Sequence, residues 1–251
     1  MLLEKEHFYE IFEPWRNKHI GLVTLPGNFG DEMILVGCLN LFKEFDVKVS
    51  LNQTSNVDEI AILGGGNVGS LWPECREIRQ HIIKTSSIPI TILPSSISDY
   101  EDLSGTRVFI RDIYSLRYWP EAILSHDMAL CYKNTKKVES KRKNGVFLRD
   151  DKESVFGKPH QDPIHMANSL DEYIELAGSC DNIITDRLHF AIASLHHGRN
   201  VTLLQNSYHK NLGVWERSLQ YFGCKFSKEL PKGIAQRPIQ TLSLWQAYCS
   251  L

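Results

Sequence analysis

The amino-acid sequence predicts an α/β protein built from two Rossmann-like domains that face each other across a cleft. Two observations predict this fold class. Short β-branched runs alternate with stretches of helical period along the 251 residues, a pattern typical of parallel βαβ units. A polar segment at residues 132–144 divides this alternation into two series. We therefore expect one domain at residues 1–135 and a second at residues 136–251, both of ordinary domain size.

The first half is expected to open with a strand at residues 19–25, which reads His-Ile-Gly-Leu-Val-Thr-Leu. A Pro-Gly-Asn loop separates this strand from a helix over residues 31–44. A second helix over residues 72–85 includes Pro73, which suits a first turn because proline has no N–H to donate. Further β-branched runs predict strands near residues 47–51, 59–63, 89–93 and 106–110.

The second half repeats the alternation after the polar segment. Residues 132–144 are basic and lack an apolar period, so we expect a solvated linker, the alternative being a patch for an anionic partner. Gly198 is expected to close one of the later helices. Strands are predicted at residues 145–149, 181–185, 200–204 and 223–226, and helices at 168–179, 187–197, 210–222 and 239–250, the last of which is expected to pack back on the first domain.

Composition and charge exclude several classes of protein. A formal net charge of −2 gives no basic field to attract nucleic acid, so we expect no nucleic-acid partner. No apolar run reaches the ~18 residues that a membrane span needs, and the first residues are too acidic for a signal peptide. We therefore expect a cytoplasmic protein. Six scattered cysteines without a C-x-x-C pair predict neither a disulfide framework nor a zinc site, and no histidine spacing predicts a metal.

The segment Thr185-Asp186-Arg187-Leu188-His189 joins a predicted buried strand to a predicted helix. Thr185 or Asp186 is expected to cap this helix. Arg187 and His189 then lie in the first turn, off the apolar stripe, where backbone N–H groups and the helix dipole favour an anion. A cation is unfavourable there unless a ligand compensates it, so the segment predicts a phosphate or carboxylate site. The alternative is an Arg187–Asp186 ion pair with His189 in the packing.

Two further cations follow neighbouring strands. Arg149 ends the run at residues 145–149, and Lys210 lies in the donor-rich segment after the strand at residues 200–204. Because the carboxyl ends of parallel strands meet at one edge of a sheet, Arg149, Arg187 and Lys210 are expected to converge. Such a set of cations suits a ligand with two acidic groups.

Each of these motifs also has a purely structural interpretation. Arg149 is followed at once by Asp150 and Asp151, so a local salt bridge is an alternative to ligand binding. Asn206 and Ser207 offer donors for an anion, but either one could equally cap the helix that begins near Lys210.

The first half offers groups that suit a sugar. Asn28 and Asp31 lie in a glycine-containing turn between a strand and a helix, where their side chains can bond hydroxyls. Residues 64–69 match the G-x-G-x-x-G pattern, but no acidic residue ends the next strand, so we do not expect a dinucleotide. We expect instead a tight turn that opens space for a ligand. The acceptor side is therefore assigned to polar positions near predicted strand ends, namely Asn28, Gly65, Asn67, Arg111 and Asp127, the last two with structural ion pairs as their alternative.

In this order the motifs resemble the polysaccharide pyruvyl transferase family over nearly the whole chain. The resemblance implies a glycosyltransferase-B-like fold without metal or cofactor. It implies transfer of the pyruvyl group of phosphoenolpyruvate, a co-substrate, to two hydroxyls of a glycan or lipid-linked sugar, forming a ketal. The matching segments are Gly27–Glu32, Gly64–Asn67, Pro94–Ile97, Arg111–Ser115, Asp127, Arg149–Asp151, Thr185–His189 and Asn206–Lys210.

The resemblance also implies roles for individual residues. His189 is the expected catalytic residue, with Asp31 as a second candidate. The donor-binding set is Arg149, Arg187, Leu188, Asn206, Ser207 and Lys210. A lipid-linked acceptor implies possible peripheral association with the inner face of the membrane. Phe190 and His209 stand where the family usually has glycine.

Two other functions stay open at this point. One is a glycosyltransferase of the same two-domain architecture that uses a nucleotide sugar, because its diphosphate would suit the same cations. The other is an inactive sugar- or phosphate-binding homologue, for which Phe190 and His209 leave room.

Overall fold

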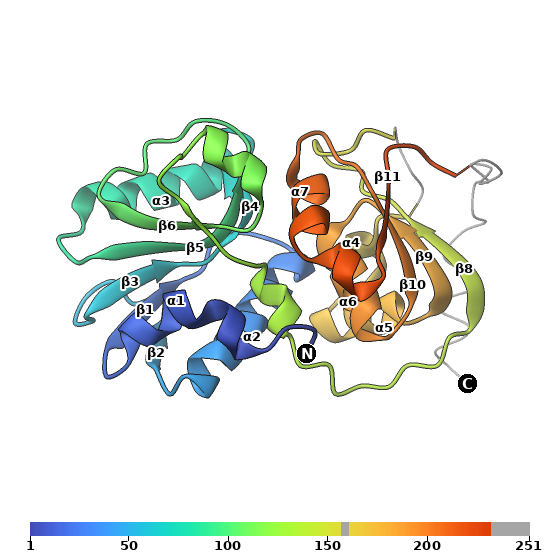
Figure 1. Ribbon diagram of the computed structural model, residues 1–251, viewed down its shortest axis with the longest axis horizontal. Helices are drawn as coiled ribbons and strands as arrows, with labels where there is room; N and C mark the ends of the chain where they lie inside the picture. The colour runs from blue at the N-terminus through green and yellow to red at the C-terminus, as the bar shows by residue number, and fades with distance from the viewer. Residues whose placement is uncertain (157–160, 232–251) are drawn as a thin grey trace.

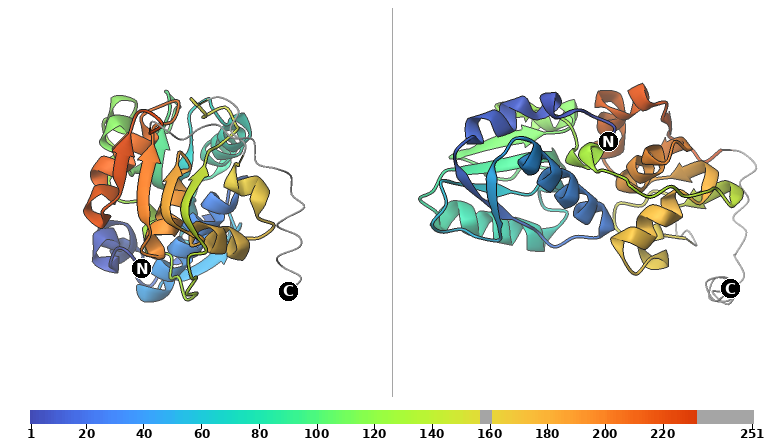
Figure 2. Two further views of the ribbon diagram at one scale, coloured as in Figure 1. Left: turned by 90° about the vertical axis from the view of Figure 1, so that its right-hand side faces the viewer. Right: turned by 90° about the horizontal axis from the view of Figure 1, so that it is seen from below.

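The computed structural model describes residues 1–156 and 161–231. The chain forms two parallel β-sheets that lie side by side along the long axis of the molecule, each with its own helices (Figure 1). In the view from below, the second half of the chain lies end to end with the first (Figure 2). The α/β class with parallel sheets is therefore confirmed, whereas the two-domain boundary at residues 135 and 136 and the Rossmann-like and glycosyltransferase-B-like descriptions stay predictions.

The first sheet has the strand order β2-β1-β3-β5-β6-β7, and β4 also pairs with β5. Every pairing in it is parallel. Helix α2 (Phe29–Glu44) follows β1, and helix α3 (Pro73–Thr85) starts one residue after Trp72 with proline in its first turn. The strands are β1 (His19–Val23), β2 (Lys48–Leu51), β3 (Glu59–Ile62), β4 (Gly65–Val68), β5 (Ile90–Ile97), β6 (Thr106–Ile110) and β7 (Ile123–Leu124).

The second sheet has the order β11-β10-β9-β8 and is also parallel. Phe147 of β8 pairs with Thr185 of β9, which pairs with Leu203 of β10, so three strands end at the same level. The strands are β8 (Arg142–Phe147), β9 (Cys180–Thr185), β10 (Asn200–Leu204) and β11 (Lys225–Ser227), and the helices are α4 (Pro163–Met166), α5 (Leu170–Ala177), α6 (Leu188–His196) and α7 (Lys210–Arg217).

One hydrophobic cluster runs through both halves of the molecule. It joins Met33 and Ile34 of α2 to Tyr173 of α5 and to Phe190 and Ile192 of α6, all fully buried. Helix α2 of the first half thus packs directly against α5 and α6 of the second (Figure 1). This shared core fixes the position of the two sheet edges relative to each other, and the functional site depends on that position.

Most predicted elements are present, with small shifts at their ends. Helix α2 begins two residues earlier than expected because Asn28 and Asp31 form a capping box, worth ~1 kcal/mol in typical helices. The predicted helix at residues 210–222 is α7 followed by a 3-10 turn, η5 (Leu219–Phe222). Gly198 follows α6 in the left-handed conformation, as predicted. The five cysteines among the described residues are buried free thiols.

Three expectations were wrong or incomplete. Residues 142–144 belong to β8, where Arg142 pairs with Cys180, and not to a linker. Residues 65–68 form strand β4 in place of a turn. The N-terminal helical turns, η1 (Lys5–Phe8), α1 (Tyr9–Phe12) and η2 (Glu13–Trp15), were not predicted, although four of their apolar residues are buried.

One predicted element lies in a part of the chain that the structure does not describe. The predicted helix at residues 239–250 and Cys249 lie outside the described residues. Among the residues that the structure describes, no helix combines the length and the apolar character needed to cross a membrane.

Candidate functional site

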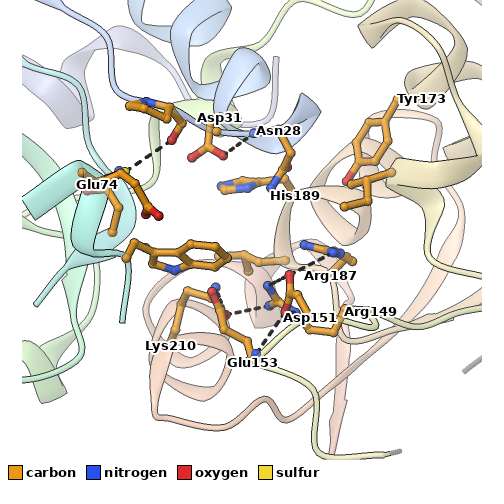
Figure 3. A pocket seen from close by; sticks show the side chains of 18 residues that line it. Asn28, Asp31, Glu74, Arg149, Asp151, Glu153, Tyr173, Arg187, His189 and Lys210 are labelled. Atoms are coloured by element: carbon orange, nitrogen blue, oxygen red, sulfur yellow. Dashed lines mark hydrogen bonds and ion pairs between the residues drawn. The ribbon is translucent and has the colours of Figure 1, made fainter. Parts of the chain in front are cut away.

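A cavity of about 460 Å³ lies where the two halves meet (Figure 3). This volume is within the ~300–1,000 Å³ typical of small-molecule sites. One wall comes from the loops after β1 and β4 and from the start of α3, and the other from the loops after β8 and β9 and from α7. The lining residues are Pro26, Gly27, Asn28, Asp31, Gly66, Asn67, Trp72, Glu74, Cys75, Arg149, Asp151, Glu153, Ile164, Tyr173, Arg187, Leu188, His189 and Lys210.

The three predicted cations converge on this cavity. Arg149 and Arg187 each follow the last residue of a strand by two positions, and the paired ends of β8 and β9 bring them to the same edge. Lys210 arrives from the next strand, at the first residue of α7. All three side chains line the cavity and are buried, with at most 6% of each residue exposed. The predicted convergence is confirmed.

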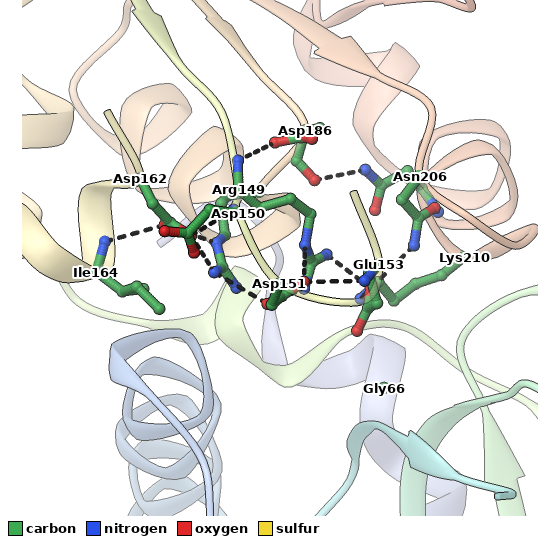
Figure 4. A network of polar contacts seen from close by, with 12 residues as sticks. Gly66, Arg149, Asp150, Asp151, Glu153, Asp162, Ile164, Asp186, Asn206 and Lys210 are labelled. Atoms are coloured by element: carbon green, nitrogen blue, oxygen red, sulfur yellow. Dashed lines mark hydrogen bonds and ion pairs between the residues drawn. The ribbon is translucent and has the colours of Figure 1, made fainter. Parts of the chain in front are cut away.

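The cations do not stand alone, because three carboxylates pair with them (Figure 4). Arg149 donates from Nε to Asp151 at 2.8 Å and from Nη1 to Glu153 at 2.6 Å. Arg187 donates to Asp162 from Nε at 2.9 Å and pairs through Nη2 with Asp151 at 3.0 Å. The sequence-based alternatives were right about Asp151 as a partner of Arg149.

Lys210 completes this network through Nζ, which pairs with Glu153. The other suggested partners are different from those expected. Asp150 pairs with His165 Nε2 at 3.2 Å and not with Arg149, while Arg187 pairs with Asp162 and not with Asp186. Glu153 follows Arg149 by four residues but lies on a loop, where this spacing does not predict proximity. Asp162 arrives from a loop, where no periodicity could indicate it.

Burial and charge pairing set the ionisation of this network. Burial alone would raise the pKa of Glu153, but Lys210 and Arg149 outweigh it and lower that pKa to about 2. Burial lowers the pKa of Lys210 to about 8, although Glu153 opposes this shift. Asp151 is less buried, and Arg149 and Arg187 overcome its desolvation and lower its pKa as well. Asp151 and Glu153 therefore stay charged at neutral pH and act as counter-ions to the buried cations.

Asp186 is buried beside the cations but behaves differently. Its Oδ1 accepts the backbone N–H of Arg149 at 2.8 Å, and its Oδ2 has no hydrogen-bond partner among the described residues. Burial raises its pKa to about 7, against the effect of the two arginines. It does not cap α6. Thr185 does not cap it either, since its hydroxyl accepts the backbone N–H of Arg187 at 3.0 Å, one residue before the helix begins.

His189 lies in the first turn of α6 and reaches the cavity between the two walls (Figure 3). Its Nε2 is 3.3 Å from Asp127 Oδ2 and 3.3 Å from Arg111 Nη1. Its Nδ1 lies against α2, where a Cβ added to Gly30 would come within 2.5 Å of it. The ring is therefore held by groups from the first half while its backbone belongs to the second.

Arg111 and Asp127 were predicted to bind the acceptor, but in this structure they lie behind His189. They form an ion pair of 2.5 Å between Nη1 and Oδ2, and both side chains are fully buried. Neither lines the cavity. Their structural alternative is thus confirmed, and a direct contact with the acceptor stays a prediction.

The opposite wall carries neutral and acidic groups. Asn28 and Asp31 are held by the capping box of α2, in which the Asn28 N–H donates to Asp31 at 2.9 Å. Asn67 is fixed by the buried Arg79, which donates to its side-chain oxygen at 3.1 Å and pairs with Glu101. Asn28, Asp31 and Asn67 were predicted as site residues. Trp72, Glu74 and Cys75 also line this wall and were not among the predicted site residues. Gly65 is not among the lining residues. Its φ of +143° favours glycine, and a Cβ added there would lie 3.2 Å from Asp31 Oδ1.

Asn206 and Ser207, predicted to bind the donor, lie behind the cations and support them. Asn206 donates from Nδ2 to Glu153 at 3.0 Å, and the Ser207 N–H donates to the Glu153 carbonyl at 3.0 Å. Neither lines the cavity, so their effect on a ligand would pass through Glu153. The predicted capping by Asn206 is confirmed, because its Oδ1 accepts the backbone N–H of Asn211, the second residue of α7, at 3.2 Å.

The two unusual residues of the sequence do not intrude on the site. Phe190 is fully buried and packs its ring on Phe147 and Tyr173, with ring centroids 4.7 and 5.2 Å apart. His209 pairs with Asp112 at 3.3 Å and packs beside Tyr114. Both belong to the packing of the molecule and leave the cavity open.

One group of side chains in the described residues has spacing suited to a metal ion. Ligand atoms of Asp150, Asp162 and His165 lie within 4.8 Å of one another. Asp162 is already engaged by Arg187 through both oxygens. A metal would have to compete with a buried guanidinium, so this cluster does not fit a resident ion.

Comparisons with known proteins identify the family of the chain. A model of the family described as polysaccharide pyruvyl transferase matches residues 28–208, a span that contains Arg149, Arg187 and His189. A solved structure of a functionally uncharacterized protein from Klebsiella pneumoniae subsp. pneumoniae NTUH-K2044 is similar, with a TM-score of 0.70 and 25% sequence identity. The similarity covers 91% of this chain and 100% of that one. No curated protein matches the chain.

Proposed function

Because the chain belongs to the polysaccharide pyruvyl transferase family, we propose that it transfers the pyruvyl group of phosphoenolpyruvate to two hydroxyls of a glycan sugar. The product is a cyclic ketal, and phosphate is released. The observation that carries this proposal is the convergence of Arg149, Arg187 and Lys210 on one wall of the cavity, opposite Asn28 and Asp31. The wall with the three cations suits an anionic donor, and the wall with Asn28 and Asp31 suits sugar hydroxyls.

The donor carries a carboxylate and a phosphate on the same carbon, C2, so it needs cations on two sides. The arginines offer planar pairs of N–H donors for this purpose, and Lys210 adds a point charge. In the structure Asp151 and Glu153 accept hydrogen bonds from these N–H groups. We expect the donor to displace at least Asp151, which is the more exposed of the two at 22% of its side chain.

The N-terminus of α2 adds to the attraction. Helix α2 spans 16 residues and directs its first turn toward the cavity and His189. The positive end of a helix dipole stabilises an anion by ~0.3–1 kcal/mol when exposed. This contribution is small beside a charge-assisted hydrogen bond of ~1.5–3 kcal/mol. The cations of the second half therefore decide donor binding, and α2 supports it.

The proposed chemistry needs one proton donor near the donor's methylene carbon, C3. His189 gives a proton to C3, which makes C2 electrophilic, and one sugar hydroxyl bonds to C2. The second hydroxyl bonds to C2 as the bond between C2 and the phosphate oxygen breaks. One hydroxyl proton restores His189 and the other leaves with phosphate, so the protein returns to its starting state. Asp31 is proposed to orient the hydroxyls, since it lines the opposite wall.

No metal or further cofactor enters this proposal, because phosphoenolpyruvate is itself the co-substrate. The acceptor is proposed to be a polysaccharide or its lipid-linked precursor. A lipid-linked acceptor would bring the protein to a membrane surface through its substrate.

Thermal unfolding with alternative ligands tests the donor. Phosphoenolpyruvate at 100 times its dissociation constant should raise the free energy of unfolding by ~2.7 kcal/mol. Matched concentrations of phosphate, pyruvate and UDP-glucose serve as controls, and each should stabilise less. Stabilisation by the nucleotide sugar without stabilisation by phosphoenolpyruvate would favour a glycosyltransferase and reject this proposal.

A further inference from the structure

We infer that Asp127 is a positioning residue that holds neutral His189 with its proton on Nε2, so that Nδ1 is the nitrogen that exchanges a proton with the substrate. The inference rests on the proposed function for the identity of the substrate. The tautomer of His189 is a property of the protein alone.

The first argument is the set of groups around Nε2. Asp127 Oδ2 lies 3.3 Å from it and also accepts from Arg111 Nη1 at 2.5 Å. A carboxylate accepts hydrogen bonds and cannot donate them, so it favours a proton on the nitrogen that faces it. Arg111 Nη1 lies at the same 3.3 Å from Nε2 and can only donate, so this contact favours the opposite tautomer. Its shorter bond, at 2.5 Å, goes to Asp127, and Arg111 and Nε2–H can both donate to that oxygen. Arg111 also keeps this carboxylate charged, because it lowers the pKa of Asp127 in spite of burial.

The second argument is the environment of Nδ1. This edge of the ring lies against Gly30 in the first turn of α2. Backbone N–H groups point out of a helix N-terminus, and the positive end of the dipole favours a lone pair over another N–H. Nδ1 takes part in no hydrogen bond among the described residues, whereas Nε2 has two polar neighbours. Asp127 at one end of the ring and the α2 N-terminus at the other therefore favour the same tautomer, against the contact with Arg111.

The third argument is that Asp127 is itself fixed. Its other oxygen, Oδ1, accepts the backbone N–H of Ala129 at 2.9 Å at the start of the 3-10 turn η4 (Met128–Cys131). Arg111 is anchored through Nε, which donates to Ser96 at 3.0 Å. The charged groups that face His189 from each packed element are thus Asp127, Arg111 and, across the cavity, Asp31 (Figure 3), with Arg187 on its own helix. Only Asp127 offers an acceptor to Nε2.

The two ring nitrogens of His189, Nε2 and Nδ1, therefore have different roles. The reaction starts from the imidazolium, in which Nε2–H donates to Asp127 and Nδ1 carries a second proton, and the adjacent carboxylate stabilises this charged ring. Nδ1 gives its proton to C3, which leaves the ring neutral with its proton on Nε2. Nδ1 then recovers a proton from a sugar hydroxyl. Asp127 touches no substrate and never takes the proton, which agrees with its burial behind the ring.

Nuclear magnetic resonance of the full chain labelled with ¹⁵N-histidine tests this inference without substrate. Spectra are recorded at a pH where the imidazoles are neutral, and His189 is assigned from its absence in His189→Gln. We expect a protonated Nε2 and an unprotonated Nδ1 in the wild-type protein. In Asp127→Asn the Nε2–H fraction should fall, while the dissociation constant of phosphoenolpyruvate stays within about threefold because the donor cations are untouched.

The chain supplies a matched control. Asp112 and His209 form a second pair of buried carboxylate and histidine, also 3.3 Å apart, outside the cavity. Asp112→Asn should leave the His189 tautomer unchanged. A wild-type His189 protonated on Nδ1, or an unchanged tautomer in folded Asp127→Asn, would overturn the inference. Nε2–H without binding of phosphoenolpyruvate would instead reject the proposed function and leave the positioning pair in place.

Discussion

At the scale of single residues, the cavity is a balance of buried charges. Arg149, Arg187 and Lys210 are each paired with a carboxylate. A buried ion pair roughly compensates its own desolvation, and removing one partner is costly because the other charge is left alone. The carboxylates thus compensate the buried charge of the cations, and an anionic ligand would take the place of a carboxylate.

Asp186 makes a specific pH dependence predictable. Its pKa is about 7 in the folded protein, against ~3.9 in an unfolded chain. Between these values the folded state holds a proton that the unfolded state has released, so the free energy of unfolding falls as pH rises. Asp186→Asn removes this ionisation and keeps an oxygen for the Arg149 N–H. Between pH 5 and pH 8 the variant should lose roughly 1–3 kcal/mol less stability than the wild type.

Urea unfolding of both proteins at several pH values measures this difference. The low pKa of Glu153 works in the opposite direction, since its stabilisation is lost only as pH falls from about 4.5 toward 2. It therefore contributes nothing to the slope between pH 5 and pH 8. Parallel curves for wild type and Asp186→Asn over that range would show that Asp186 is ionised in the folded protein.

At the scale of elements, the contact between α2 and the first turn of α6 sets the position of His189. Gly30 lies in the first turn of α2, where alanine would normally favour the helix by ~1 kcal/mol. Here a Cβ would meet His189 Nδ1 at 2.5 Å. The ring has to shift to make room, which changes its position against Asp127, so the cost falls on the catalytic geometry more than on the fold.

Gly30→Ala is therefore expected to reduce phosphate release from phosphoenolpyruvate and acceptor by more than about tenfold, since general acid catalysis contributes ~10²–10⁴-fold. Donor affinity should change little. Gly37→Ala is the control for packing in the same helix, because its Cβ would meet the Met128 carbonyl oxygen at 2.0 Å. That variant should lose stability in urea unfolding. Wild-type turnover in Gly30→Ala would mean that the position of His189 does not limit the reaction.

The sequence predicted the elements of the second half well, and with them the cations. Apolar residues end β8 and β-branched residues end β9, and parallel strands bring their ends together, so the sequence alone could place Arg149 and Arg187 at one edge. Glu153 and Asp162 could not be placed in the same way, because they lie on loops with no period to read. Pairing between distant segments, such as Arg111 with Asp127 behind His189, also depends on tertiary packing that the sequence does not reveal.

At the scale of the whole molecule, the site exists only where the two halves meet. Tyr208 donates its hydroxyl to the Gly66 carbonyl at 3.2 Å, and a Cβ on Gly66 would crowd Tyr208 and Lys210. His126 and Ser218 form another polar contact between the halves at 2.8 Å. With the shared hydrophobic cluster, these contacts fix both walls of the cavity in one arrangement.

This arrangement predicts cooperative unfolding. Since α2, α5 and α6 share one buried cluster, neither sheet can lose its helices without exposing the core of the other. Differential scanning calorimetry of the full chain should show a single transition whose calorimetric and van't Hoff enthalpies agree. Two resolved transitions would show that the halves are independent domains and that the cavity is a contact between separately folding units.

The most direct test of the account is a calorimetric titration of phosphoenolpyruvate into the wild-type chain, Arg187→Ala and His189→Ala. We expect saturable binding to the wild type and an affinity roughly 10- to 100-fold weaker in Arg187→Ala, because each charge-assisted hydrogen bond contributes ~1.5–3 kcal/mol. His189→Ala should bind nearly as well as the wild type and fail to turn over. Absence of binding to the wild type, or equal affinity in Arg187→Ala, would contradict the assignment of this cavity to the donor.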